Sequence, residues 1–230
     1  MFTQLTLGMR LRDDATFDNF VEGDNAELIA TVQSALNGQM TGCLMIWGEQ
    51  GAGKTHLLQA AYQYAETLAK RAFYLPLHEA VTLDSALLQD LDAMDVLLFD
   101  DIEAISDNMA WQEAVFHLYN RLRDAGKTLV ITGLKPPAQL SLTLPDLRTR
   151  LGADLVFHCQ PLSDQHKMLA IQQRAEQRGF ELPDAVCTFM ISRLPRQMDA
   201  LLSALDTLDQ ASLAEQRKLT VPFVKDVLSL

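Results

Sequence analysis

The sequence predicts an α/β fold with a parallel sheet, followed by a small all-helical domain. Two patterns lead to this prediction. Short apolar runs alternate with segments of helical periodicity up to about residue 160, and only helical patterns follow Pro161. Strands that alternate with helices are typical of crossover units, which pair their strands in parallel. We therefore expect a flexible N-terminal segment (1–14), an α/β domain (15–160) and a helical domain (161–230).

Composition narrows the class of protein. The 230 residues are 48% hydrophobic, enough for one domain or two small ones. The net charge is −11, and no long cationic run occurs, so direct tight binding to DNA phosphates is not expected. No apolar stretch is long enough to cross a bilayer, and no secretory signal is present, so we expect a cytoplasmic protein. The three cysteines are far apart and form no CxxC pair, which favours small buried side chains over a zinc site or disulfides.

Continuous apolar runs mark the strands of the first domain, since strands buried on both faces lack polar alternation. The predicted strands are Cys43–Trp47, Ala72–Leu77, Val96–Phe99, Thr128–Thr132 and Leu155–Phe157. Helical spacing of apolar residues marks the segments between them. The predicted helices are Thr55–Leu68, a short one at Asp84–Leu91, and Asn108–Ala125, which Gly126 ends.

Capping residues predict where the helices of the second domain begin. Ser163 suits the N-terminus of a helix that ends at Gly179, and Pro183 suits the first turn of the next helix. A third helix is predicted over Arg196–Gln210, with leucines on one face. Thr220, with a proline two residues later, begins a short final helix.

A glycine-rich segment joins the first strand to the first helix. Residues 48–55 read GEQGAGKT and fit the complete pattern G-x-x-x-x-G-K-[ST] in the context that the pattern requires. Glycines let successive N–H groups turn toward phosphate oxygens, and the helix N-terminus adds a favourable dipole. Lys54 supplies a charge for the outer phosphates, and the Thr55 hydroxyl suits Mg²⁺. The expected nucleotide contacts in this segment are Gly48, Gly51, Ala52, Gly53, Lys54, Thr55 and the adjoining His56.

Two carboxylates follow the buried strand Val96–Phe99. The carboxyl ends of parallel strands meet at one edge of the sheet, so both are expected beside the phosphate loop. We expect Asp100 to hold Mg²⁺ through water and Asp101 to polarise an attacking water. Thr132 ends the next strand, where a hydroxyl can orient water; the alternative is an ordinary β-branched strand residue.

The chain resembles one family in five segments. These are TFDNFVEGDNAEL (16–28), the phosphate loop, LLFDDIEAI (97–105), ITGLKPP (131–137) and DLRTRLG (146–152). In this order they resemble the ATPase core of the bacterial replication initiator DnaA, a member of the AAA+ class of P-loop NTPases, with its helical lid. Because the resemblance covers only the ATPase core and the lid, we expect this chain to lack the initiator's long N-terminal region and its helix-turn-helix DNA-binding domain. It therefore resembles the DnaA-homologous regulators that promote hydrolysis of DnaA-bound ATP.

The resemblance implies roles for further residues. Arg150 matches the arginine finger, acting in trans on a DnaA partner, with Arg148 as an alternative; Arg196 matches the lid arginine that senses nucleotide. Ordinary surface arginines remain the competing interpretation. The segment that packs near the adenine contains Phe17, Phe20 and Val21. Leu134 departs from the family, which usually has an acidic residue there.

The first residues resemble a docking peptide. Gln4, Leu5, Leu7 and Met9 match the pattern Q-L-x-L-x-hydrophobic that inserts into the sliding clamp, the beta subunit of DNA polymerase III. The alternative is a short disordered tail.

The function expected from these features is inhibition of replication initiation. The protein would bind ADP or ATP with Mg²⁺, dock on the DNA-loaded clamp and stimulate ATP hydrolysis in DnaA. One alternative is a self-contained ATPase of the helicase-loader or remodelling type. Another is a nucleotide-gated scaffold that uses the clamp only for recruitment. The sequence leaves nucleotide-dependent self-association open.

Overall fold

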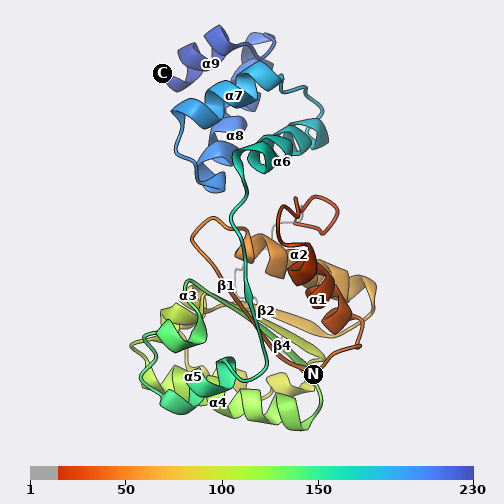
Figure 1. The fold of residues 1–230 in the computed structure, drawn as a ribbon, viewed down its shortest axis with the longest axis vertical. Coiled ribbons are helices and arrows are strands. Elements are labelled where there is room, and N and C mark those ends of the chain that lie inside the picture. Colours follow the sequence, from red (N-terminus) through yellow and green to blue (C-terminus); the bar gives the residue numbers. More distant parts are fainter. Residues whose placement is uncertain (1–14) are drawn as a thin grey trace. The chain divides into compact units, whose positions relative to one another are not determined.

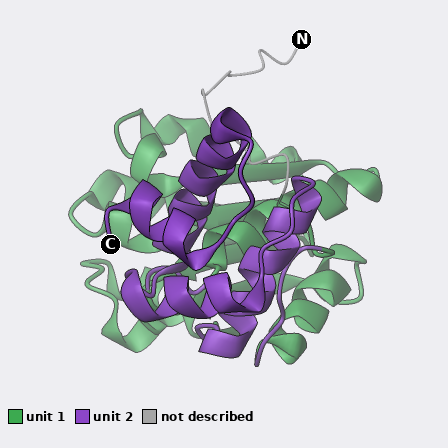
Figure 2. Cartoon of the chain, turned by 90° about the horizontal axis from the view of Figure 1, so that it is seen from above, with its two compact units in different colours: residues 1–18, 25–49, 53–159 green, residues 19–24, 50–52, 160–230 purple. Residues whose placement is uncertain are grey.

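The computed structural model describes residues 15–230. The expectations for the segment 1–14, including those for Gln4, Leu5, Leu7 and Met9, lie outside the described residues. The chain forms two compact units, coloured separately in Figure 2. The described part of unit 1 is residues 15–18, 25–49 and 53–159, and unit 2 is residues 19–24, 50–52 and 160–230. Residues 50–52 of the phosphate loop belong to unit 2, and the rest of the loop belongs to unit 1.

A five-stranded parallel sheet with the order β2-β3-β4-β1-β5 forms the centre of unit 1 (Figure 1). All five strands lie where the apolar runs predict them. Their bounds are β1 Gly42–Trp47, β2 Ala72–Pro76, β3 Val96–Asp100, β4 Thr128–Gly133 and β5 Leu155–His158. The strand order places β3 between β2 and β4, so side chains from these three neighbours meet at the carboxyl edge of the sheet.

Helices cover both faces of the sheet. Successive strand residues point to opposite faces, and one face packs its apolar side chains on α4 (Met109–Asp124). The shared core on that side includes Met45, Phe99, Ile131, Trp111, Val115 and Leu118. On the other face α2 (Lys54–Thr67) contacts β2, β3 and β4, and α1 (Ala26–Leu36) packs against α2. The predicted helix over 108–125 is confirmed, with the Asn108 side chain accepting from the Trp111 N–H at 3.2 Å.

The predicted short helix Asp84–Leu91 is wrong in kind. The segment forms two 3₁₀ helices instead, η1 (Ser85–Leu88) and η2 (Leu91–Ala93). Leu88 ends η1 and Leu91 begins η2, and both side chains are buried. The Leu88 carbonyl accepts from the Arg121 guanidinium at 2.9 Å rather than continuing a helical ladder. Tertiary contacts from α4 therefore decide the local geometry.

Several shorter elements of unit 1 were not predicted. Most are too brief to show helical periodicity, and α1 alone is long enough to carry an apolar stripe. They are α1, α3 (Leu77–Ala80), η3 (Ile102–Ile105), η4 (Pro137–Gln139) and α5 (Pro145–Leu151).

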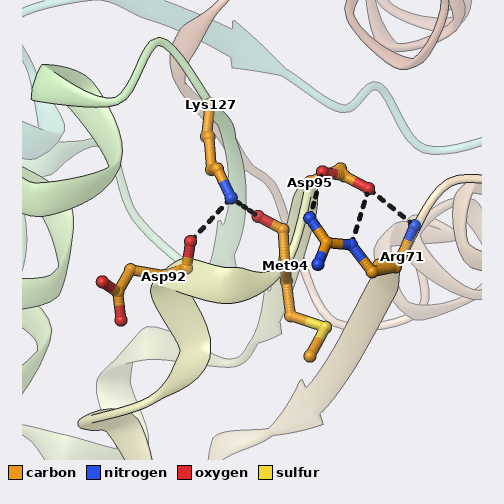
Figure 3. A network of polar contacts seen from close by, with 5 residues as sticks. All are labelled: Arg71, Asp92, Met94, Asp95 and Lys127. Atoms are coloured by element: carbon orange, nitrogen blue, oxygen red, sulfur yellow. Dashed lines mark hydrogen bonds and ion pairs between the residues drawn. The ribbon is translucent and has the colours of Figure 1, made fainter.

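Charged side chains tie the amino ends of three strands together (Figure 3). Arg71, just before β2, donates to the Asp95 carboxylate from its backbone N–H at 2.9 Å and its guanidinium at 3.0 and 3.2 Å. The guanidinium lowers the pKa of Asp95 to about 2. Lys127, just before β4, donates to the backbone carbonyls of Asp92 and Met94, each at 2.6 Å. These polar contacts therefore link the segments that lead into β2, β3 and β4.

Unit 2 contains a core made by four helices. They are α6 (Asp164–Gln177), α7 (Asp184–Arg193), α8 (Met198–Glu215) and α9 (Val221–Leu228). The expected caps are confirmed at Ser163, which accepts from the His166 N–H, and at Thr220, which accepts from the Phe223 N–H. Pro183 takes the N-cap position of α7 rather than a place in its first turn. The third helix begins at Met198, so Arg196 precedes it instead of opening it.

Two negative expectations can be compared with the described residues. The three cysteines are free and buried, as expected, and burial raises the pKa of the Cys159 and Cys187 thiols to about 11. Within residues 15–230 no helix is both long and apolar enough to span a membrane.

Candidate functional site

The phosphate loop has the backbone that its glycines predict. Gly51 and Gly53 have φ angles of +79° and +97°, in the left-handed region that side chains other than glycine rarely adopt. Gly53 is the N-cap of α2 and, as a glycine, has no side chain that could cap the helix. The first backbone N–H groups of a helix have no partner within the helix, so this end of α2 suits an anion. A Cβ at position 48 would lie 2.6 Å from the Cys159 carbonyl, which requires glycine there as well.

Lys54 is buried and turned onto its own loop. Its ammonium donates to the carbonyl oxygens of Gly48 at 2.8 Å and Glu49 at 2.9 Å, and the residue is 6% exposed. A lysine ammonium has three donors, so one remains for a phosphate oxygen. Lys54 therefore fixes the start of the loop and presents a charge at the same point.

The residues after Lys54 take different positions. Thr55 is exposed, and its hydroxyl has no hydrogen-bond partner within residues 15–230. The His56 ring lies 3.4 Å from the Thr16 carbonyl oxygen, and Ala52 is buried. Thr55 is thus the one member of this group with a free oxygen ligand, which is the role expected of it.

Asp100 lies at the end of β3 and is almost completely buried. One carboxylate oxygen accepts from the Thr132 hydroxyl, and the other accepts from the Tyr74 hydroxyl at 3.0 Å. The Thr132 oxygen also accepts the Asp101 backbone N–H at 3.0 Å. Sequence reasoning placed Asp100, Asp101 and Thr132 at this edge, and in the structure a single hydroxyl joins all three.

Asp101 has an unusual backbone and an unusual carboxyl group. Its φ is +61°, which is uncommon for a residue other than glycine and marks local strain. Burial, followed by the neighbouring carboxylates of Asp100 and Glu103, raises the pKa of Asp101 to about 6. Lys54 and His78 act in the opposite direction, and the His78 ring lies 3.7 Å from the carboxylate. A carboxyl group with a pKa near neutrality can exchange a proton with water at physiological pH.

A Mg²⁺ ion with a nucleotide fits this donor set. No group of three His, Cys, Asp or Glu side chains suited to a metal occurs in the described part of the chain. Mg²⁺ commonly uses one or two protein oxygens and takes the rest from water and substrate phosphates. The free Thr55 hydroxyl and the Asp100 carboxylate suit that arrangement.

The residues expected near an adenine divide between the units. Phe17 is in unit 1, where its ring packs edge-to-face on Tyr64 with centroids 5.5 Å apart. Phe20 and Val21 are half-buried and belong to the segment 19–24 of unit 2. Their role at a nucleotide stays a prediction.

Two of the three candidate arginines have no fixed partner in the part of the chain that the structure describes. Arg148 and Arg150 are half-buried in the last turn of α5, and within residues 15–230 neither guanidinium makes a hydrogen bond or ion pair. Arg196, in unit 2, lies 3.6 Å from the Asp164 carboxylate, and its side chain is 70% exposed. The backbone N–H of Leu134, the residue that departs from the family pattern, donates to the Glu103 carboxylate at 3.1 Å.

Sequence reasoning missed Tyr74 and His78. Tyr74 is inside a predicted strand, and His78 follows that strand in α3; neither belongs to a motif. Burial and the Asp100 charge raise the pKa of Tyr74 well above its ordinary value, so its hydroxyl stays protonated. The pairing of β2 with β3, which the sequence did not predict, brings the Tyr74 hydroxyl to the Asp100 carboxylate.

Family models match almost the whole described chain. Residues 11–158 match the model described as the bacterial DnaA ATPase domain, and residues 164–228 match the model described as "Hda, lid domain". The first match alone covers more than half of the sequence.

Solved structures agree with this assignment. Domain III of DnaA from Thermotoga maritima is 25% identical with a TM-score of 0.84, and the match covers 96% of this chain and 98% of that one. AMPPCP-bound DnaA from Aquifex aeolicus is 23% identical with a TM-score of 0.75, covering 86% of this chain and 66% of that one. A RuvB variant from Thermotoga maritima shares the fold at 16% identity, with a TM-score of 0.72 and coverage of 96% and 73%. This chain has an AAA+ fold and belongs to the family of the bacterial DnaA ATPase domain.

Proposed function

We propose that this replication-related AAA+ protein is a negative regulator of initiation that stimulates the hydrolysis of ATP bound to DnaA. The match of residues 164–228 to the Hda lid model is the observation that carries the proposal, because the DnaA-homologous regulators promote this hydrolysis. An arginine on a DnaA-like core would supply the chemistry. Arg150 would enter the nucleotide site of a DnaA partner and stabilise the charge that develops on the transferred phosphate.

The chain's own nucleotide serves as a structural ligand in this proposal. Similar structures are DnaA proteins bound to AMPPCP, and the left-handed glycines and Lys54 suit a polyphosphate. ADP or ATP would bind the loop through N–H groups and Lys54, with Mg²⁺ at Thr55 and facing Asp100. Phe17, Phe20 and Val21 would line the base, and Arg196 would respond to the bound nucleotide. The protein would act in the cytoplasm with the replication apparatus.

Recruitment would come from the N-terminal peptide. Docking of Gln4, Leu5, Leu7 and Met9 on a DNA-loaded clamp would raise the local concentration of the regulator beside DNA-bound DnaA. A pull-down with purified clamp tests this step, comparing Gln4→Ala with Thr6→Ala, which changes a position that the pattern leaves open. Loss with Gln4→Ala alone supports docking, and equal retention by both variants excludes it.

The central experiment measures ATP hydrolysis by DnaA in the presence of clamp, DNA and this protein. The wild-type chain is expected to accelerate it, and Arg150→Ala is expected to lose about 10³-fold of that acceleration. Arg148→Ala, on the same turn of α5, is the matched control and should keep the stimulation. Full stimulation by Arg150→Ala removes the finger assignment, whereas no stimulation by the wild type removes the proposed function.

A second candidate function is a self-contained ATPase of the loader or remodelling type. The grouping of Asp100, Asp101 and Thr132 in unit 1 favours it, since these groups suffice to orient a metal and a water. Rapid turnover without any partner, accompanied by ring formation, would support this function. Turnover that requires DnaA would exclude it.

A further inference from the structure

A buried row of polar side chains connects α2 to the carboxylate at the end of β3. Tyr74 and Asp100 share one face of the sheet, because Tyr74 pairs with Leu98, two residues before Asp100. The Tyr74 hydroxyl donates to one Asp100 oxygen at 3.0 Å, and the Thr132 hydroxyl donates to the other. Donors on the two strands that flank β3 therefore hold the carboxylate from both sides.

Gln59 on α2 extends this row to a third residue. It is 5% exposed and shares a side-chain hydrogen bond with the Tyr74 hydroxyl, while its own Oε1 has no partner in the structure described. The Gln59 amide nitrogen can only donate, so it takes a lone pair of the tyrosine oxygen and leaves the hydroxyl proton for Asp100. Gln59 thus fixes the direction in which Tyr74 donates.

The two hydrogen bonds orient the Asp100 carboxylate and leave acceptor positions on it for other donors. An ionised carboxylate offers about four acceptor positions, and the two hydroxyls occupy one on each oxygen. The two hydroxyls therefore hold the buried carboxylate in place from both strands. The remaining positions can receive water bound to a metal ion.

We propose that Tyr74 is a positioning residue for Mg²⁺, holding the Asp100 carboxylate in the orientation that receives metal-bound water. The inference rests on the proposed binding of a Mg²⁺-nucleotide. It assigns a function to a strand residue outside the phosphate loop and outside the two-carboxylate motif. Partners that orient a group facing a metal typically contribute about 10–100-fold to metal affinity.

The test is calorimetric titration of the full chain with ADP and ATP, in EDTA and over a range of Mg²⁺ concentrations. In Tyr74→Phe the gain in nucleotide affinity produced by Mg²⁺ should fall about 10-fold, while the affinity in EDTA stays at the wild-type value. This split distinguishes positioning of the metal from general damage to the site.

Tyr119→Phe is the matched control. The Tyr119 hydroxyl also donates to a carboxylate, that of Asp154 at 3.2 Å, and Tyr119 is likewise buried, on α4. Asp154 directly precedes β5 and accepts the Cys43 N–H, so this pair lies at the amino edge of the sheet. Removing that hydroxyl should leave the Mg²⁺ dependence unchanged.

The outcomes separate the inference from the proposed function. A wild-type Mg²⁺ dependence in Tyr74→Phe, or an equal loss with and without Mg²⁺, overturns the role of Tyr74 and leaves nucleotide binding intact. A wild-type chain that binds neither nucleotide under any condition overturns nucleotide binding itself. If Tyr74→Phe does not fold, Gln59→Met serves instead, since it removes the group that directs the tyrosine. A smaller Mg²⁺-specific loss then supports the inference, and an unchanged Mg²⁺ dependence overturns it.

Discussion

The two edges of the sheet in unit 1 use the same chemistry for different purposes. At the carboxyl edge the Lys54 ammonium donates to the carbonyls of Gly48 and Glu49, and at the amino edge the Lys127 ammonium donates to those of Asp92 and Met94. Only the first lysine stands beside strained and unpaired groups, namely Asp101 with its φ of +61° and the free Thr55 hydroxyl. Strain and unmet hydrogen-bonding capacity, rather than charge alone, distinguish the edge with the candidate site from the opposite edge.

One carboxyl group at each edge of the sheet shows the same difference between the edges. Asp95 at the amino edge has its pKa lowered to about 2 by Arg71. Asp101 at the carboxyl edge has its pKa raised to about 6, chiefly by burial. A carboxyl group stabilised in its charged form supports folding at neutral pH, whereas one whose charged form is disfavoured reduces stability as pH rises through its shifted range. Ionisation of Asp101 in the candidate site therefore lowers the stability of the folded protein, whereas ionisation of Asp95 at the opposite edge raises it.

Substitution of Lys54 should produce the largest effect on binding. Lys54→Ala removes the ammonium that donates to the carbonyls of Gly48 and Glu49, and the affinity for ADP should fall about 100-fold. Isothermal titration measures this. Lys127→Ala is the control, because it removes the equivalent contacts at the amino edge and should bind ADP normally. Comparable losses in both variants would contradict the functional difference between the edges.

Removal of the Thr132 hydroxyl should cause the largest loss of stability. Thr132→Val leaves the Asp101 N–H and one oxygen of the buried Asp100 without their partner, so the free energy of unfolding should fall by about 2 kcal/mol. Urea denaturation checks the value. Thr128→Val, at the start of the same strand, loses only a 3.4 Å contact to the Met40 carbonyl and should cost less. The reverse order would refute the importance of the hydroxyl bridge.

Lys127 should affect stability but not ligand binding. Lys127→Ala frees two carbonyls that approach β3, and the free energy of unfolding should fall by about 1 kcal/mol. Lys135→Ala is a suitable comparison, because that exposed lysine makes no hydrogen bond or ion pair within residues 15–230. Equal stability of the two variants in urea would show that the contacts of Lys127 contribute nothing.

Acid sensitivity at the amino edge should give the smallest effect. The folded pKa of Asp95 is lower than the unfolded one, so its contribution is present above about pH 4 and is lost as pH falls toward 2. Asp95→Asn should move the acid-unfolding midpoint upward by a fraction of a pH unit, since the ion pair is exposed and screened. Circular dichroism between pH 2 and 5 follows the transition. An unmoved midpoint, matching that of Asp107→Asn, would show that the pair is energetically neutral.

Elements with a strong local pattern could be predicted from the sequence. The apolar runs gave all five strands, and Asn108, Ser163 and Thr220 marked helix starts that the structure confirms by hydrogen bonds from backbone N–H groups. The prediction of a helix over Asp84–Leu91 was wrong because the Arg121 guanidinium, on a helix distant in the sequence, donates to backbone carbonyls of this segment. Local periodicity cannot report a contact with a residue 33 positions away.

The sequence by itself determined the phosphate loop, because conformationally permissive glycines, one lysine and one threonine are specified at consecutive positions. It also determined that two carboxylates follow a buried strand. Only the tertiary structure decided what those carboxylates touch. The order β2-β3-β4 sets Tyr74 and Thr132 on either side of Asp100, 26 and 32 residues away along the chain. Side chains so far apart meet only when strand order and register are fixed, and those follow from packing of the whole sheet rather than from any local pattern.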